Sequence, residues 1–214
     1  MILEPVLSLG YSFSKRGETD RRLSFAAYFL LSLITLGIYG LWVFYQLIAR
    51  RDRHFQRQVR THEGILELIK SRSAGREDEV KVEIAYLENL LLAAHDEEAE
   101  RGAALWTVLS VFLGIPTLYV QYFLMKDFHE HDQREARFLD AASSALLKLG
   151  VLKSPIRKEP VVPRRNFWWY LFLTVVSFGL FGLYWMYVLI HDPNNHFEEQ
   201  DVWENAVVNI ARLA

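Results

Sequence analysis

The chain has 214 residues, of which 51% are hydrophobic and 14% aromatic, and its formal net charge is −2. It contains no cysteine, which excludes disulfide bonds, thiolate metal sites and cysteine nucleophiles and leaves the redox compartment open. The average composition would also suit a soluble domain, so the distribution of the apolar residues must decide between the classes.

The N-terminal segment, residues 1–24, begins with the sequence MILEPVLSLG. It carries Glu4 and Pro5, and its apolar run is too short for the core of a signal peptide. We therefore expect membrane entry to depend on apolar segments further along the chain.

Three segments lack every charged residue and histidine: Phe25 to Ala49, Gly102 to Met125 and Asn166 to Ile190. Each is close to the roughly 20 apolar residues that mark a membrane segment. One such segment could be a buried soluble helix, but three of matched length predict a membrane protein. The expected organisation is an N-terminal segment 1–24, membrane repeat 25–49, helical hairpin 50–101, membrane repeat 102–125, helix and Pro-rich linker 126–166, membrane repeat 167–190 and amphipathic helix 191–214.

The three apolar segments are copies of one another, because they align without gaps at offsets of 77 and 142 residues. Internal repeats take precedence in reading a fold. The match includes a glycine at the centre of each segment and a histidine beyond its end. The matched columns hold Gly37, Gly114 and Gly179, and then His54, His131 and His196.

The central glycine predicts a break within each apolar segment. Gly37, Gly114 and Gly179 each follow a helix-compatible run and precede a bulky aliphatic residue, the pattern of a Schellman cap with glycine at C′. Pro116 adds a second break signal in the middle copy, since proline suits the first turn of a new helix. Each segment is then helix, break, helix, with one kinked transmembrane helix as the alternative.

Topology favours re-entrant hairpins over single spans. The histidine-bearing tails of the three repeats are alike, which is easier to explain if all of them lie on the same side of the membrane. Three single spans would also divide the Lys and Arg residues almost evenly, 13 against 11, with no positive-inside bias. We therefore expect hairpins that enter from the cytoplasmic face and leave all polar segments cytoplasmic.

The polar segments show helical periodicity. Residues 50–101 predict a helical hairpin with a turn at 71–78, whose apolar stripes include Phe55, His62, Leu66, Val80 and Leu87. The charge run at 95–101 is interpreted as a solvated face. The three prolines of 150–166 predict an extended linker, and Pro193 is expected to end one helix before a last helix over 196–213.

No phosphate loop, nucleophile elbow or His-Glu-x-x-His motif occurs, so no enzyme is expected and no catalytic residue is assigned. His54, His131 and His196 are the best chemical candidates, because three imidazoles that converge on a threefold axis can hold a metal. The favoured interpretation is that they are interfacial histidines on helix surfaces that face lipid headgroups. On that reading the chain has no metal or cofactor site.

The stretch LLSLITLGIYGLW resembles the Thr-Leu-Gly-Ile-Tyr signature of small bacterial membrane proteins known only as a domain of unknown function. The likeness is good at 30–45, fair at 173–187 and weak at 110–122, where Pro116 and Thr117 replace Tyr-Gly. This resemblance implies a bacterial inner-membrane protein and transfers no catalytic residue.

The expected fold is an all-α membrane protein, and the expected function is that of a non-enzymatic scaffold. Its hairpins would insert into the cytoplasmic leaflet, and would shape the membrane or anchor a partner. The partners are lipids, further copies of the chain or a protein docked on the cytoplasmic helices, and not nucleic acid. The alternative is an oligomeric transport or metal-handling protein that uses the repeated histidines.

Overall fold

The computed structural model describes residues 3–213, with the side chains of 7–208. Helices make up 80% of it and the described part contains no strand, so the predicted all-α class is confirmed. The elements are α1 (Leu3–Ser14), α2 (Arg16–Thr19), α3 (Phe25–Ile34), α4 (Ile38–Arg72), α5 (Glu77–Glu97), α6 (Ala103–Leu113), α7 (Pro116–Lys148), α8 (Phe167–Val176) and α9 (Leu180–Leu213).

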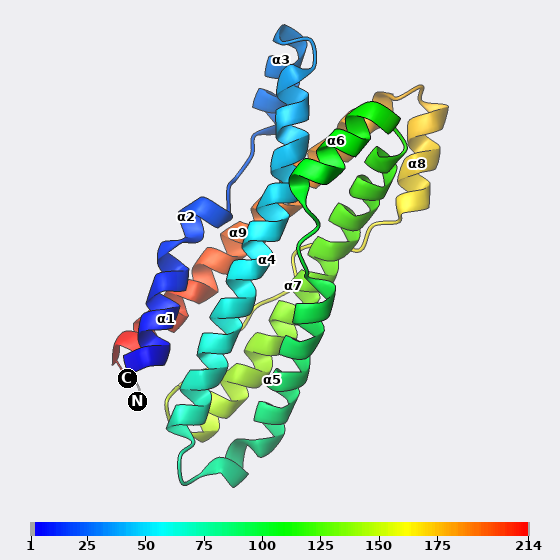
Figure 1. Ribbon diagram of the computed structural model, residues 1–214. Helices are drawn as coiled ribbons and strands as arrows, with labels where there is room; N and C mark the ends of the chain where they lie inside the picture. The colour runs from blue at the N-terminus through cyan, green and yellow to red at the C-terminus, as the bar shows by residue number, and fades with distance from the viewer. Residues whose placement is uncertain (1–2, 214) are drawn as a thin grey trace.

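Three helix pairs follow the same plan. In each pair a short apolar helix (α3, α6 or α8) leads through a tight turn into a helix of 33 to 35 residues (α4, α7 or α9). The three turns lie at one end of the molecule, and the long helices run together from there to the opposite end (Figure 1). α5 returns along α4 and α7, while α1 packs against α4 and α9.

The turn of the first copy is a Schellman motif. The N–H of Gly37 donates to the Ser32 oxygen at 2.7 Å, and the N–H of Leu36 donates to the Leu33 oxygen at 3.4 Å. Leu36 (φ 49°) therefore occupies C′, and Gly37 (φ 92°) follows it at C″. The prediction that Gly37 stands at C′ is therefore wrong by one residue, because the helix ends one residue earlier than expected.

The third copy repeats this geometry, whereas the middle copy differs. Phe178 (φ 52°) and Gly179 (φ 90°) take the places of Leu36 and Gly37, and the Gly179 N–H donates to the Thr174 oxygen at 2.8 Å. In the middle copy Gly114 (φ 71°) ends α6, and Pro116 starts α7 two residues later.

Each turn divides its apolar segment into a short apolar helix and the apolar start of a long helix. Within residues 3–213, no helix has both the length and the apolar character needed to cross a membrane. The first arms contain 10 or 11 residues and are about 15 Å long at 1.5 Å per residue.

The interior has two apolar cores with a polar layer between them. One core lies near the turns and includes Phe44, Phe123 and Trp185, and the other lies toward the far end and includes Phe138 and Trp203. The polar layer is made of buried side chains from the middle of the long helices. Its members include Arg50, Arg51, His54, Arg57, Gln58, Asp127, His131, Asp132, Glu135, His196, Gln200 and Glu204.

α9 continues through Pro193, so the predicted interruption and the separate last helix are wrong. Proline has no N–H, and the carbonyl of Leu189, four residues earlier, lacks its helical donor. Arg50 replaces that donor, because its Nη2 donates to the Leu189 oxygen at 2.7 Å and to the Ile190 oxygen at 3.1 Å. A cation from α4 thus keeps the third long helix intact.

Candidate functional site

The three repeated histidines meet at the centre of the bundle. His54 lies on α4, His131 on α7 and His196 on α9, and their exposed fractions are 0%, 1% and 0%. The Nε2 atom of His54 lies 3.3 Å from Nε2 of His131 and 3.1 Å from Nε2 of His196. The favoured interpretation of these residues as surface histidines is therefore wrong. We call them the histidine cluster.

Each histidine presents its other ring nitrogen to a buried carboxylate. The Nδ1 contacts are His54 with Asp20 at 2.8 Å, His131 with Glu98 at 2.9 Å and His196 with Asp132 at 2.9 Å. A carboxylate in this position fixes both the tautomer and the orientation of an imidazole.

Each of these carboxylates is also bound by a cation. The pairs are Asp20 with Arg57 at 2.6 Å, Glu98 with Arg134, and Asp132 with Lys158. The same series of contacts, from a histidine to a carboxylate to a cation, therefore occurs three times around one centre. We call each series a relay. Arg57 and Arg134 stand three residues after their histidines, while Lys158 comes from the linker between α7 and α8.

The relay determines which nitrogens carry protons. An ionised carboxylate only accepts hydrogen bonds, so the Nδ1 of each neutral ring must donate, and Nε2 is left with a lone pair. Three acceptors then face one another, with Nε2 separations of 3.1 Å and 3.3 Å from His54 to its two neighbours. The cluster contains no donor of its own for these lone pairs.

The protonation states agree with this assignment. Burial lowers the pKa of His54 to about 3, although Asp20 opposes the shift, and burial also lowers the pKa of His196. Burial alone would raise the pKa of Asp20, but His54 and Arg57 bring it below its usual range. The rings of His54 and His196 are therefore neutral at pH 7, and Asp20 beside His54 is ionised.

Aromatic rings and one further carboxylate complete the surroundings. The Phe55 ring stacks on His131 with centroids 4.2 Å apart, and the Phe197 ring lies 4.7 Å from that of His54. Glu135 is fully buried, and its Oε2 lies 3.8 Å from Nε2 of His196 and 3.1 Å from Nζ of Lys158. The other oxygen of Glu135, Oε1, has no hydrogen-bond partner among the described residues.

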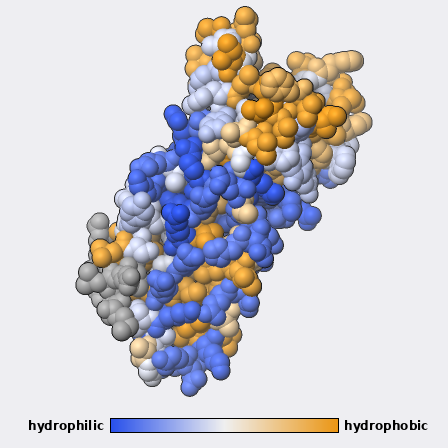
Figure 2. Space-filling view, in the orientation of Figure 1, coloured by the Kyte–Doolittle hydropathy of each residue, from blue (hydrophilic) through white to orange (hydrophobic). Residues whose placement is uncertain are grey.

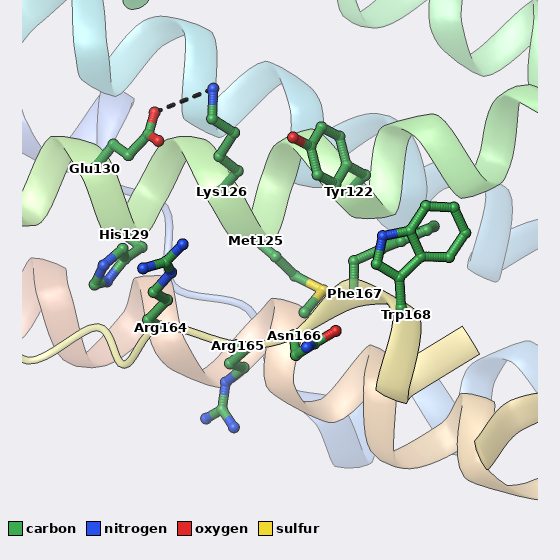
Figure 3. A pocket seen from close by; sticks show the side chains of 10 residues that line it. All are labelled: Tyr122, Met125, Lys126, His129, Glu130, Arg164, Arg165, Asn166, Phe167 and Trp168. Atoms are coloured by element: carbon green, nitrogen blue, oxygen red, sulfur yellow. Dashed lines mark ion pairs between the residues drawn. The ribbon is translucent and has the colours of Figure 1, made fainter. Parts of the chain in front are cut away.

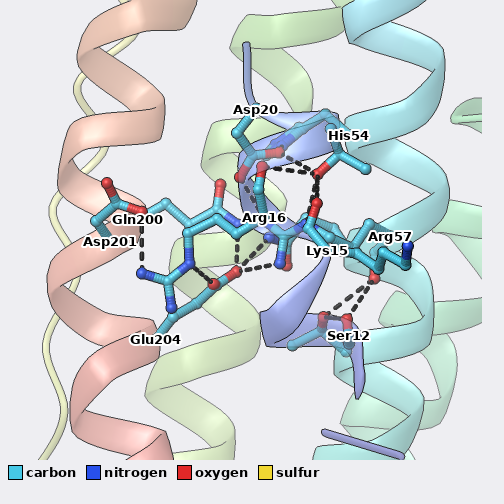
Figure 4. A network of polar contacts seen from close by, with 12 residues as sticks. Ser12, Lys15, Arg16, Asp20, His54, Arg57, Gln200, Asp201 and Glu204 are labelled. Carbon is cyan, nitrogen blue, oxygen red and sulfur yellow. Dashed lines mark hydrogen bonds and ion pairs between the residues drawn. The ribbon is translucent and has the colours of Figure 1, made fainter. Parts of the chain in front are cut away.

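A network of ion pairs holds the first relay in place (Figure 4). Arg57 donates to Asp20 at 2.6 Å and to Glu204 at 2.7 Å, and Arg16 of α2 lies 2.8 Å from Glu204. These contacts join α2, α4 and α9 around Asp20. The short helix α2 therefore positions the carboxylate that faces His54.

The carboxylate partners of His54 and His131 were not predicted from the sequence. Glu98 was assigned to a solvated charge run, but it is buried between His131 and Arg134. A weak signal existed, because Asp20 and Glu98 stand 34 and 33 residues before their histidines. Lys158 offered no such signal, since the third copy takes its cation from a linker.

The second candidate site is the end of the molecule that carries the three turns. On the face seen in Figure 2, apolar side chains gather at this end, and the opposite half is mainly polar. The exposed fractions of Leu36, Phe112 and Phe178 are 94%, 81% and 98%. We call the exposed side chains next to the turns the tip residues: Ile34, Leu36, Ile38, Phe112, Ile115, Phe178 and Leu180.

A basic groove of about 710 Å³ lies where the polar and apolar parts meet, between α7 and the start of α8 (Figure 3). Lys126, Arg164 and Arg165 line it together with the exposed ring of Trp168. Lys126 and Arg165 are ion-paired with Glu130 and Asp192, whereas Arg164 forms no ion pair with the side chains described for residues 7–208. We call this feature the basic groove.

No curated protein and no solved structure matches the chain. A family profile does match it twice, at residues 23–71 and 165–212, which contain the first and third repeats. The middle repeat is not among the matched residues, although His131 occupies the same centre as His54 and His196. The profile is described as a domain of unknown function, DUF4234, and the two matches fit an uncharacterised family.

Proposed function

We propose that the protein is a non-enzymatic membrane scaffold whose three hairpins insert into one leaflet and shape the membrane or anchor a partner. One observation carries the proposal: all three turns lie at one end and expose their apolar side chains there. Contiguous exposed apolar surface of this kind marks an interaction site.

The backbone at the turns supports a lipid environment. Leu36 and Phe178 adopt the left-handed conformation, which costs a residue with a Cβ about 1–2 kcal/mol. In water, these exposed side chains gain no burial energy that would offset this cost. In hydrocarbon, burial of each side chain contributes about 1.5–3 kcal/mol, which offsets the strain.

Two features support insertion into a single leaflet: the length of the short helices, and the residues at the boundary between the apolar end and the polar half. Arms about 15 Å long reach half of a hydrocarbon core of about 30 Å. The basic groove and the exposed Trp168 and Trp169 lie at the base of the third hairpin, where anionic headgroups and the aromatic belt would be. We place the polar half on the cytoplasmic side of a bacterial inner membrane, with lipids and a homo-oligomeric or protein partner as its contacts.

Liposome flotation tests the proposal. Replacing Phe178 with Ser should weaken partition of the purified protein into anionic liposomes by about tenfold or more. The matched control is Val202→Ser, which removes an exposed apolar side chain from α9 in the polar half. Equal partition of both variants would contradict insertion through the turns.

Vesicle shape separates a scaffold from a passive anchor. Hairpins confined to one leaflet expand that leaflet, so tubules or smaller vesicles should form as protein density rises. Unchanged vesicles at high density, with flotation intact, would leave anchoring alone.

A further inference from the structure

We propose that His54, His131 and His196 bind one divalent transition-metal ion, and that Zn²⁺ is the ion that the site fits best. The proposal does not depend on membrane insertion, because it rests on the polar layer of the bundle. The three ligands come from three helices and three repeats, so one ion would join α4, α7 and α9.

The positions of the nitrogens fit a metal. Zinc binds imidazole nitrogens at about 2.0–2.1 Å, and tetrahedral angles then separate two such nitrogens by about 3.3–3.4 Å. The Nε2 separations from His54 are 3.1 Å and 3.3 Å. These two separations therefore match those between nitrogens around a single bound ion, and the ligand atoms of all three histidines lie within 4.8 Å of one another.

The hydrogen bonds of the three histidines resemble those that histidine ligands make at metal sites. Histidine ligands almost always donate their second N–H to a carboxylate or carbonyl, which orients the ring and raises its basicity. All three histidines meet a buried carboxylate at 2.8 to 2.9 Å. A single histidine that packs in a core needs no such partner, and three equivalent relays indicate a shared purpose.

The charge balance leaves room for a cation. The groups around the cluster comprise four buried carboxylates (Asp20, Glu98, Asp132 and Glu135) and three cations (Arg57, Arg134 and Lys158). One negative charge is therefore in excess. Glu135 is nearest to the lone pairs, with Oε2 at 3.8 Å from Nε2 of His196, and it is the residue placed to supply a fourth ligand.

The donor set selects the class of metal. Neutral imidazoles suit zinc, copper, nickel and iron, whereas magnesium and calcium require oxygen ligands. The fully buried position and the Phe55 and Phe197 rings exclude water from the centre. A closed site of this kind is typical of a structural metal that stabilises a fold.

The competing explanation is a proton shared between the imidazoles, and metal analysis separates the two. The full-length protein in detergent is stripped with a chelator, loaded with Zn²⁺, desalted and assayed by elemental analysis. We expect one zinc per chain and a higher unfolding temperature. With Co²⁺ as the probe, we expect the visible absorption bands of a tetrahedral complex.

Variants assign the binding to the cluster. The triple substitution of His54, His131 and His196 with Gln should abolish binding, whereas His95→Gln should retain it, because His95 is exposed on α5. Glu98→Gln leaves all ligands in place and should weaken affinity about 10- to 100-fold through loss of the carboxylate behind His131. This milder variant remains informative if the triple variant does not fold.

Two results would overturn the proposal. One is a folded wild-type protein that retains no zinc and shows no thermal shift or Co²⁺ spectrum, which would indicate the shared proton. The other is stoichiometric zinc that persists in a folded triple variant, or a zinc affinity of Glu98→Gln, measured by competition with a chelator, that equals the wild-type affinity. Neither outcome affects the flotation test of membrane insertion.

Discussion

Replacing Leu36 with glycine should change stability and membrane binding in opposite directions. Leu36 is left-handed (φ 49°) and 94% exposed, so glycine relieves about 1–2 kcal/mol of strain. The greater freedom of glycine in the unfolded chain lowers the free energy of unfolding by about 0.5–1 kcal/mol. The free energy of unfolding in detergent should therefore stay the same or rise by up to about 1.5 kcal/mol.

Partition into liposomes should fall with the same substitution. Burial of a leucine side chain contributes about 1.5–3 kcal/mol, which corresponds to a roughly 10- to 150-fold weaker partition once the side chain is removed. Flotation over a lipid titration measures this ratio, and denaturant unfolding in mild detergent measures the stability.

The control is Leu33→Gly, which removes the same exposed side chain from the last turn of α3. There the backbone is helical, so glycine should lower the free energy of unfolding by about 1 kcal/mol. If Leu36→Gly destabilised the protein as much as Leu33→Gly, or left partition unchanged, the strained turn would have no role in insertion.

Three further outcomes are expected. Gly179→Ala should lower the free energy of unfolding by about 1–2 kcal/mol because φ is 90°. Gly182→Ala should raise it by up to about 1 kcal/mol in the same denaturation assay, because the residue is helical and a Cβ would meet Thr174 at an ordinary contact distance of 3.7 Å. Burial lowers the pKa of His62 to about 4, so the stability that the neutral ring contributes is complete above about pH 6.5 and is lost as the pH falls toward 4. His62→Gln should remove about 2 kcal/mol of the stability change between pH 7 and pH 5, and an unchanged pH profile would contradict the burial of that ring. Cysteines at the exposed positions Ala74 and Ser154 should both resist an impermeant thiol reagent in intact cells, and labelling of only one would establish single spans.

The sequence was sufficient for features that depend on neighbouring residues. Charge-free segments, helical stripes and glycine breaks are local patterns, and the all-α class follows from them. The one-residue error at the turns arose because glycine is the usual residue at the left-handed C′ position. Leu36 takes that position in the structure, and the sequence gives no sign that a leucine adopts it.

Features that depend on distant partners could not be predicted. Pro193 ends a helix by local rules, yet Arg50, 143 positions earlier in the chain, supplies the missing donor and α9 continues. The histidine repeat predicted candidates for one centre. Their burial and their carboxylates required the packing of α2 and of the loop after α5, which no periodic pattern reveals.

The linker lysine shows how the three copies have become unequal. Arg57 and Arg134 occupy the same position in copies one and two, but the third copy has Glu199 there and takes Lys158 from the chain before it. A protein with only one such repeat would have to trimerise to build this centre, and its three sites would be identical. Fusion into a single chain removes that requirement. It lets the copies differ, and it makes the carboxylate that faces His196 depend on a cation from the linker, Lys158, rather than on one from its own long helix.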